Sequence, residues 1–380
     1  MNVAPALLEP LRVARIWGAQ SLAPLYPDSE RFIGRVGEVW LTGETCRFAI
    51  GPFAGQTLGE AWPQMPAEWT GTRLTERPGI PLLAKFIFPG DKLSVQVHPD
   101  DAYAQEHESA AGGVGKTEMW YVAAASAGAK VLLGLGVNVT RQKFMRSLSD
   151  GTTEQCLEAI PVRAGDSIFV PAGTVHAIGP GVILYEMQQY SDLTYRVFDY
   201  NRFGAGGISR ELHVEKAMDV MRFGPPAAGE AAPGVVEPIA IQGGPNAERL
   251  LLVACRYFAV ERWKFSGRVT IETSPERFEL LTPLEGTGRF SFPGGLSADV
   301  SRAARAAHPP DVGANGAAEE FSYAPGQAWL IPAALGIYIL EPSAPTTLLR
   351  AYVPNLDALE QELAGGDRTA RAARPRGTQQ

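Results

Sequence analysis

Several features that define other protein classes are scarce or missing in this sequence. It has three cysteines, Cys46, Cys156 and Cys255, and none belongs to a CxxC pair, which argues against a disulfide scaffold, a zinc ribbon or an iron–sulfur cluster. No apolar run approaches the roughly 18 residues of a membrane span. The N-terminus lacks the basic segment and apolar run of a signal peptide. We therefore expect a cytoplasmic protein with reduced thiols and no membrane contact.

Excess positive charge is missing as well. Of the 380 residues, 34 are Lys or Arg and 41 are Asp or Glu, which gives a net charge of −7 and argues against a nucleic-acid partner. A phosphorylated small molecule can still bind where a few cations gather. The chain does contain ample core material (45% hydrophobic residues) and many turn formers (41 glycines and 30 prolines). This composition favours a turn-rich β architecture over a helix bundle.

The pattern of apolar residues predicts a mainly β protein with a few short helices. Short apolar runs bounded by glycine and proline, typical of strands, fill the ranges 30–100, 117–135, 167–198 and 249–291 and close the sequence near 328–341. Helices are expected at 100–107, from about 140 to 160 with an interruption near Gly151, and at 209–221. The segment 223–238 is rich in proline, glycine and alanine, which predicts a linker.

The length and this linker predict two domains. We expect an N-terminal domain at 1–222, a linker at 223–248, a C-terminal domain at 249–360 and a disordered basic tail at 361–380. An internal echo suggests two copies of one β unit, because RAGDSIFVPAGTVHAI (163–178) aligns without gaps with APGQAWLIPAALGIYI (324–339). His176 of the first copy corresponds to Ile337 of the second, so only the first copy is expected to hold a metal.

Four potential metal ligands lie on three of the expected β segments. In KLSVQVHPDD, Gln96 and His98 point to the same side of a strand, about 7 Å apart. In GKTEMWY, Lys116 and Glu118 share a face in the same way, and the turn in VPAGTVHAI brings His176 to the start of the next strand. Two imidazoles, a carboxylate and an amide oxygen suit a divalent ion such as zinc in a catalytic site.

Each of these residues also has an ordinary explanation. A strand with polar residues on one side can simply face solvent, and a single histidine is more often structural than a ligand. The chain has only five histidines, and the same polar character recurs in three segments, which together favour a metal site. The other histidines lie outside these three segments. His107 ends a predicted polar helix, His213 lies on a predicted amphipathic helix and His308 lies in a predicted loop of proline and alanine.

At these residues the chain closely resembles the type I mannose-6-phosphate isomerases, particularly the short bacterial form. The matching stretches are RIWGAQSL (15–22), GEVWLTG (37–43), DKLSVQVHPDD (91–101), GKTEMWYV (115–122), GDSIFVPAGTVHAIG (165–179) and YSDLTYRVFDYNR (190–202). The resemblance covers most of the chain from about 12 to 355. The motifs are specific as an ordered set, although no single one of them would be.

The resemblance implies a fold, a cofactor and an activity. The fold is a pair of cupin barrels (double-stranded β-helix or jelly-roll), the first of which carries one zinc ion per chain. The activity is the interconversion of mannose 6-phosphate and fructose 6-phosphate through a metal-stabilised cis-enediol. The zinc ligands of the family correspond to Gln96, His98, Glu118 and His176, and its functional lysine and arginine correspond to Lys116 and Arg196.

The sequence departs from the longer family members at the phosphate end of the substrate. Those members end the arginine-bearing segment with threonine, proline and lysine, where this chain has Tyr200, Asn201 and Arg202. Arg202 is therefore our candidate for the phosphate contact, by its place six residues beyond Arg196.

Two other functions fit parts of the sequence. One is an iron-dependent cupin dioxygenase, although such sites usually offer more imidazoles than the two here. The other is a sugar-binding cupin without catalysis, against which the presence of Lys116, Glu118, His176 and Arg196 argues. The sequence leaves open the preferred phosphosugar, the group that removes the C2 proton, the role of the basic tail, and whether the protein is a monomer or a homodimer.

Overall fold

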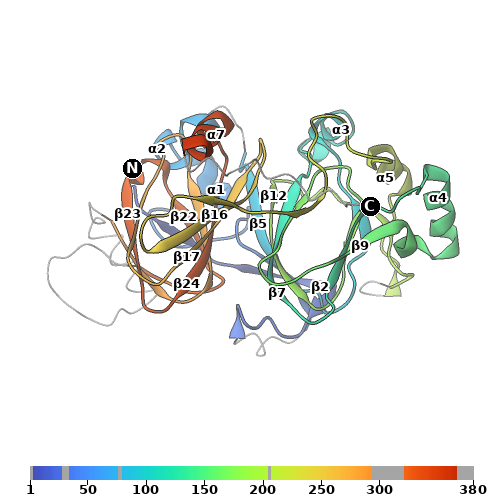
Figure 1. Cartoon of the computed structure of the whole chain (residues 1–380), viewed down its shortest axis with the longest axis horizontal. Helices are drawn as coiled ribbons and strands as arrows, with labels where there is room; N and C mark the ends of the chain where they lie inside the picture. Colours follow the sequence, from blue (N-terminus) through green and yellow to red (C-terminus); the bar gives the residue numbers. More distant parts are fainter. Residues whose placement is uncertain (1–2, 28–33, 76–78, 204–206, 293–320, 366–380) are drawn as a thin grey trace.

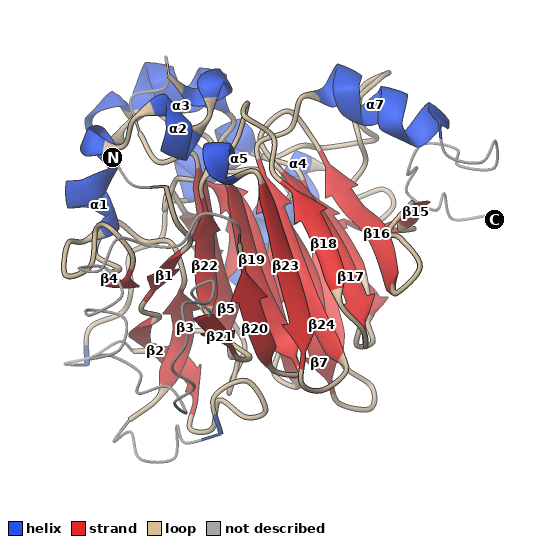
Figure 2. Cartoon of the chain, turned by 90° about the vertical axis from the view of Figure 1, so that its left-hand side faces the viewer, coloured by secondary structure: helices blue, strands red, loops and turns tan. Residues whose placement is uncertain are grey.

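The chain forms two β-barrels that lie side by side, with most helices gathered at one end of the strands (Figures 1 and 2). The computed structural model describes residues 3–27, 34–75, 79–203, 207–292 and 321–365. The loop expected at 293–319 and most of the expected tail lie outside these ranges. The predicted fold class, mainly β with two cupin-type barrels and a few short helices, is confirmed.

The first barrel consists of a seven-stranded and a five-stranded antiparallel sheet. The larger sheet has the order β14 (Gly234–Val236), β10 (Ser167–Val170), β7 (Glu118–Ala125), β12 (Val182–Gln189), β5 (Leu82–Ile87), β3 (Val36–Trp40) and β2 (Leu11–Ala19). The smaller sheet has the order β13 (Tyr195–Phe198), β6 (Val95–Val97), β11 (His176–Ile178), β8 (Lys130–Leu135) and β9 (Leu157–Pro161).

The second barrel consists of an eight-stranded and a four-stranded sheet. The larger sheet has the order β15 (Ile239–Ile241), β16 (Ala247–Ala254), β17 (Ala259–Phe265), β24 (Thr346–Tyr352), β19 (Glu279–Glu285), β22 (Ala328–Ile331), β1 (Ala6–Leu8) and β4 (Phe48–Ile50). The smaller sheet has the order β18 (Val269–Glu272), β23 (Ile337–Pro342), β20 (Gly288–Ser291) and β21 (Phe321–Tyr323).

Helices connect and cover the barrels. They are α1 (Leu58–Ala61), α2 (Ala67–Thr70), α3 (Asp101–His107), α4 (Arg141–Asp150), α5 (Val214–Val220) and α7 (Leu356–Gly365), with 3-10 turns at Trp62–Gln64, Thr72–Leu74, Ser109–Ala111, Thr153–Cys156 and Ala333–Leu335. The helix expected at 100–107 is confirmed: the Asp100 side chain caps it by accepting from the Tyr103 amide at 2.9 Å.

The two large sheets pack back to back, and strand alternation sorts their side chains between two environments. On β12, Tyr185 and Met187 point to the core between the barrels, while Leu184 points into the core of the first barrel. Glu186 and Gln188 share the inward side with Leu184 and are buried. The polar residues inside the barrel therefore come from strands whose other face is held by apolar packing between the barrels.

The two barrels repeat the same strand register, in agreement with the internal echo. In the first barrel Glu118 lies opposite Val170, where β7 pairs with β10. In the second barrel Glu279 lies opposite Ile331, where β19 pairs with β22. Glu279 is thus the structural counterpart of Glu118.

The sequence ranges expected for the domains do not map one to one onto the barrels. The N-terminal strand β1 pairs with β22 of the second barrel, and β4 pairs with β1. The expected linker contains β14, which pairs with β10 of the first barrel, and β15, which pairs with β16 of the second. N-terminal strands therefore complete the second barrel, and the expected linker contributes one strand to each barrel.

Two helix predictions and the start of the expected tail need correction. The helical stretch expected from about 140 to 160 does break at Gly151, which adopts a positive φ of 68° after α4 ends at Asp150, but it does not resume: the rest forms a 3-10 turn and strand β9. The helix expected at 209–221 is confined to α5. The disordered tail was expected to begin at 361, but α7 continues to Gly365, and Glu362 on this helix forms an ion pair with Arg249.

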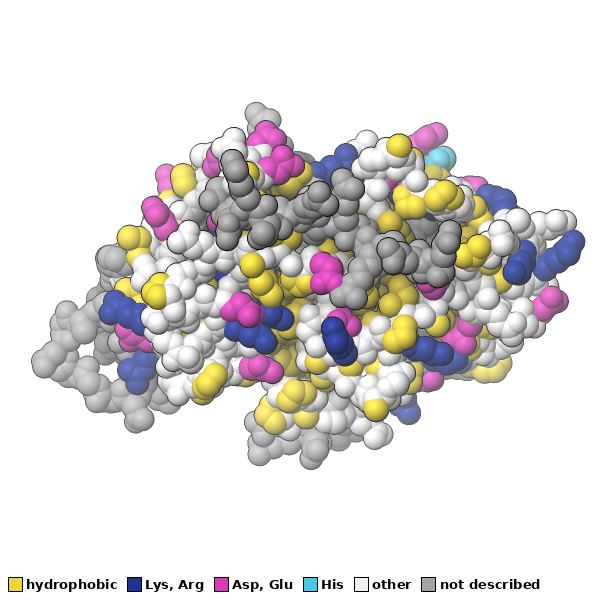
Figure 3. Space-filling view, viewed as in Figure 1, with side chains coloured by type: hydrophobic (Ala, Val, Ile, Leu, Met, Phe, Trp, Pro, Cys, Tyr) yellow, Lys and Arg dark blue, Asp and Glu magenta, His cyan; other side chains and the backbone are white. Residues whose placement is uncertain are grey.

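No helix in the described part of the chain is long and apolar enough to cross a membrane. On the face drawn in Figure 3, basic and acidic side chains are interspersed rather than gathered by sign.

Candidate metal and sugar-phosphate site

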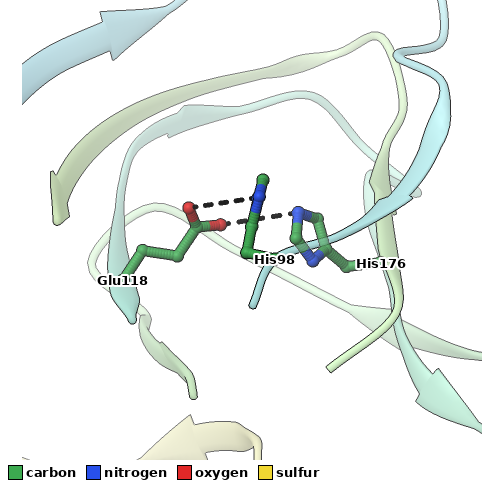
Figure 4. A group of neighbouring side chains, drawn as sticks. All are labelled: His98, Glu118 and His176. Carbon is green, nitrogen blue, oxygen red and sulfur yellow. Dashed lines mark ion pairs between the residues drawn. The ribbon is translucent and has the colours of Figure 1, made fainter. Parts of the chain in front are cut away.

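Three side chains from three strands converge inside the first barrel. His98 follows β6, Glu118 begins β7 and His176 begins β11, and one potential ligand atom from each lies within 4.8 Å of the others (Figure 4). The Glu118 carboxylate lies 3.7 Å from His98 Nε2 and 3.5 Å from His176 Nε2. All three residues are at most 2% exposed. Among the described residues this is the one such group of His, Cys, Asp or Glu.

The register of the small sheet adds Gln96 and Arg196 to the same side. Gln96 lies opposite His176 on β11 and opposite Arg196 on β13, and residues directly opposite each other project from the same face. The Gln96 amide group is 3.2 Å from His176 Nε2. The four predicted ligands are therefore brought together, and Arg196 is placed next to them.

Both histidines are oriented by backbone carbonyls. The Nδ1–H of His98 donates to the Leu193 carbonyl at 2.7 Å, and the Nδ1–H of His176 donates to the Thr174 carbonyl at 2.9 Å. These bonds leave the lone pair of each Nε2 facing the cluster. An imidazole held through its other nitrogen is the usual arrangement for a metal ligand.

The electrostatics of the cluster favour the protonation states that bind a cation. Burial would raise the pKa of Glu118, but it is outweighed by opposing effects, of which the charge of Lys116 is the largest, and the pKa is lowered to about 2. Burial, followed by the charge of Lys116, lowers the pKa of His98 well below its usual value, and burial also lowers that of His176. A carboxylate and two neutral imidazoles result, so the residues present fit a divalent metal ion.

Lys116 lies against this cluster. Its Nζ is 3.0 Å from Glu118 Oε2, 3.1 Å from His98 Nε2 and 3.9 Å from Glu186 Oε1, and the residue is 3% exposed. Lys116 and Glu118 point the same way, as predicted from strand alternation. The ammonium therefore contacts two of the candidate metal ligands.

Sequence reasoning missed a second layer of charge behind Lys116. Lys85 on β5 and Glu186 on β12 lie opposite each other and form a buried ion pair of 3.1 Å. The indole Nε1–H of Trp120 lies 3.1 Å from both Glu118 Oε1 and Glu186 Oε2. Burial and the charge of Glu118 raise the pKa of Glu186. Two carboxylates and two ammonium groups thus alternate inside the barrel.

One sequence signal could have found these residues. Lys85 is the single charge in the run PLLAKFIF, and Glu186 the single charge in VILYEMQQ. A lone charged residue in an otherwise apolar strand is seldom buried unless it is paired.

Arg196 is half-buried and held in place by neutral groups. Its Nε–H donates to Ser94 Oγ at 3.2 Å, and Nη1 donates to the Glu211 carbonyl at 3.0 Å. Burial, followed by the charge of Arg210, lowers the pKa of Arg196. Among the described residues, the guanidinium therefore lies near other cations and forms no ion pair.

Arg202 forms several hydrogen bonds to other groups of the protein, which the sequence did not indicate. It donates to Asp199 Oδ1 at 2.7 Å, to Asp91 Oδ2 at 3.3 Å and to the Lys92 carbonyl at 2.5 Å. Arg210 also binds Asp199 through its Nε and Nη2, the former at 2.7 Å. Sequence reasoning missed Arg210. Arg202 and Arg210 share Asp199, and Arg202 also contacts Asp91. With Arg196 close enough to be affected by both arginines, three guanidinium groups lie near two carboxylates.

In the second barrel, an arginine lies beside the carboxylate that corresponds to Glu118. On β24, Arg350 lies opposite Leu281, which follows Glu279 by two residues. In the first barrel, Glu186 lies opposite Trp120, which follows Glu118 by two residues. Arg350 therefore takes the place of Glu186. The Arg350 guanidinium binds Glu279 directly and lies 3.5 Å from Glu261. An internal cation therefore neutralises the carboxylate that corresponds to Glu118.

The remaining ligand positions of the second barrel are also changed. Ile337 begins β23 as His176 begins β11, and its partner Glu272 lies on the exposed side of β18. The hydroxyl of Tyr338 donates to Glu279 at 3.1 Å. These contacts agree with the expectation that the second copy holds no metal.

Comparisons with known proteins point in one direction. The chain is 36% identical over 293 residues to a probable mannose-6-phosphate isomerase of Bacillus subtilis, which covers 75% of this chain and 87% of that protein. It is 42% identical over 213 residues to a mannose-6-phosphate isomerase of Streptococcus mutans, covering 56% and 63%. The crystal structure of a Bacillus subtilis mannose 6-phosphate isomerase superposes with a TM-score of 0.75 at 26% identity, covering 91% and 99%. No protein-family model matches.

Proposed function

Because the chain belongs to the mannose-6-phosphate isomerase family, we propose that it interconverts mannose 6-phosphate and fructose 6-phosphate. The observation that carries this proposal is the buried convergence of His98, Glu118 and His176, with Lys116 against them. An aldose–ketose isomerase must move a proton between two neighbouring carbons while negative charge develops on oxygen. A buried ammonium beside a set of ligands that fits a divalent cation suits that task.

We further propose that one zinc ion binds to Gln96, His98, Glu118 and His176. Two imidazoles, a carboxylate and an amide oxygen suit zinc, and no thiolate takes part. Such an ion would stabilise negative charge on two adjacent sugar oxygens as a Lewis acid. The amide oxygen of Gln96 would face the ion once its side chain is turned, since the two ends of an amide are exchanged by a flip.

Lys116 is the group we propose to hold or move a proton beside the sugar. Its ammonium can donate hydrogen bonds to sugar oxygens, and its contacts with Glu118 and His98 keep it in place. Arg196 stays charged, so we assign it to binding the sugar oxygens rather than to removing a proton. A positioned acid or base contributes roughly 10²–10⁴-fold to the rate.

The phosphate is proposed to bind near Arg196, Arg202 and Arg210. The charges of Arg210 and Arg202 both act on Arg196, so the three guanidinium groups share one region. Asp199 orients Arg202 and Arg210 by accepting hydrogen bonds from both. A fork of guanidinium donors suits a phosphate. Arg202 thus keeps the role predicted from the sequence, with Arg210 added.

A coupled assay tests the function. Purified protein is incubated with mannose 6-phosphate, and the appearance of fructose 6-phosphate is followed, together with the metal content. We expect turnover, one zinc per chain, loss of turnover after exhaustive chelation, and recovery when zinc is returned. The absence of fructose 6-phosphate would contradict the proposal, and bound iron with oxygen consumption would favour a dioxygenase.

The cytoplasmic location and the assembly as monomer or homodimer stay predictions. Fractionation of the source cells and light scattering of the purified protein would test them.

A further inference from the structure

The carboxylate of Asp101 joins the two barrels beside the candidate site. Asp101 is the first residue of α3, three positions after His98. Its Oδ1 accepts from the Gly115 amide at 3.0 Å and from Gln189 Nε2 at 2.8 Å. Its Oδ2 accepts from the Tyr257 hydroxyl at 2.6 Å and from Arg256 Nη2 at 3.2 Å. One carboxylate thus receives four donors from three separate parts of the chain.

On the side of the first barrel, these bonds hold the segment that carries Lys116 and Glu118. The Thr117 amide donates to Gln189 Oε1 at 2.8 Å, and the Gln189 amide donates to the Thr117 carbonyl at 3.1 Å. Gln189 is 4% exposed and Thr117 is 6% exposed. Through the amide of Gly115 and through Gln189, Asp101 therefore fixes the backbone on both sides of Lys116.

On the side of the second barrel, the bonds come from the turn between β16 and β17, which carries Tyr257. Ala254 and Ala259 pair at the base of this turn. The Arg256 side chain is 70% exposed, so its ion pair with Asp101 contributes little. The Tyr257 hydroxyl makes a short hydrogen bond to a carboxylate, which is the stronger kind of contact.

We propose that Asp101 and Tyr257 are positioning residues, through which the second barrel fixes Lys116 and Glu118 in the first. The path runs from Tyr257 to Asp101 and Gln189, and from there to the backbone of Thr117. This inference rests on the proposed isomerase function, in which Lys116 acts on the sugar. It gives the second barrel, which lacks the ligands of the first, a role in catalysis.

The catalytic rate should depend on this chain of hydrogen bonds, because catalytic groups act only when they are held in the correct position. A displacement of about 1 Å can cost roughly 100-fold in rate. Tyr257→Phe removes one hydroxyl and keeps the ring that stacks with Arg256. We expect kcat to fall about tenfold, within that limit, while KM and the zinc content stay near those of the wild type.

Tyr323→Phe is the matched control. It removes a hydroxyl in the second barrel that bonds only to Thr346 among the contacts described, so it should lower the melting temperature without changing kcat. A second pair of variants separates positioning from folding. Asp101→Asn keeps the shape of the side chain and one acceptor oxygen for Gly115 and Gln189, and its amide N–H can donate to the Tyr257 hydroxyl, whereas Asp101→Ala removes the whole polar group. We expect Asp101→Asn to retain most of the kcat that Asp101→Ala loses.

Amide hydrogen exchange provides a readout that does not depend on turnover. The amides of Gly115 and Thr117 should exchange faster in Tyr257→Phe and Asp101→Ala than in the wild type, but not in Tyr323→Phe. If the wild type isomerises the sugar and both variants keep its kcat and its exchange rates, the positioning role is refuted while the function stands. If the wild type has no activity, the proposed function fails, and the exchange rates still decide whether the path exists.

Discussion

Arg350→Met should unfold the protein at a much lower temperature, because it removes the cation that neutralises the buried carboxylate of Glu279. Arg350 is 4% exposed and binds Glu279, with Glu261 3.5 Å away. Glu261 keeps Arg249, which donates to both of its oxygens at 2.9 and 2.7 Å. Glu279 keeps only the Tyr338 hydroxyl among the described contacts to its carboxylate. The uncompensated charge therefore falls on Glu279.

The magnitude follows from that single orphaned carboxylate. Removing one partner of a buried ion pair costs about 3–5 kcal/mol. At roughly 2–4 °C per kcal/mol for a domain of about 150–250 residues, that loss corresponds to a drop in melting temperature of roughly 6–20 °C. The double variant Arg350→Met/Glu279→Gln removes the orphaned charge as well, so it should be more stable than the single variant by roughly 1–3 kcal/mol.

Differential scanning calorimetry and urea unfolding measure both effects. Arg268→Met is the control, because Arg268 is 61% exposed and lies 3.6 Å from Glu341 at the surface; its effect should stay within about 0.5 kcal/mol. If Arg350→Met melted within about 2 °C of the wild type, smaller than any effect expected for a buried ion pair, Arg350 would not be the internal cation of this barrel.

Three further predictions concern the site and the pH dependence. His176→Ala should remove the bound zinc and lower kcat by more than the roughly 10–100-fold typical of mutating a residue that only hydrogen-bonds to a metal ligand. His107→Ala is the control, because the His107 side chain is 44% exposed, and it should change neither the zinc content nor kcat. Metal analysis and the coupled assay measure both. Arg210→Met should raise KM for mannose 6-phosphate roughly tenfold with little change in kcat, whereas Arg163→Met, 84% exposed at its side chain, should leave both unchanged in steady-state kinetics. The pKa of Glu261 is lowered to about 2 from its ordinary 4.5, since burial is outweighed by the charges of Arg350 and Arg249. Its contribution to stability is therefore present above pH 4.5 and lost as the pH falls toward 2. In Glu261→Gln, the free energy of unfolding measured in urea should therefore decrease less steeply as the pH falls from 4.5 to 2.

The strand pattern predicted which residues could form the site, but not how they meet. Gln96 and His98, and Lys116 and Glu118, each share a face because strand side chains alternate, and this holds whatever the strands pair with. The pairing of His176 with Gln96 joins residues 80 positions apart. That distance in sequence leaves no local signal, so the convergence was a hypothesis until the register was known.

Local signals also failed where tertiary pairing overrode them. The helix was expected to resume after an interruption near Gly151, yet Leu157–Pro161 forms β9 because β8 offers it a partner strand. The ion pair of Lys85 with Glu186 was missed for a related reason. Each residue is an isolated charge in an apolar strand, and its partner lies on a strand about 100 residues away in the sequence.

By itself the sequence determined the β class, the absence of a helix bundle, the identity of the candidate ligands and the lack of a histidine at the second copy of the site. These depend on residue type and on a two-residue period, both of which can be read locally. Only the tertiary structure decided that β1 and β4 complete the second barrel, that Arg350 stands opposite the strand of Glu279, and that Tyr257 reaches Asp101 across the two barrels. Each of these depends on strand register between distant segments, which is set by the packing of whole sheets rather than by any short stretch of chain.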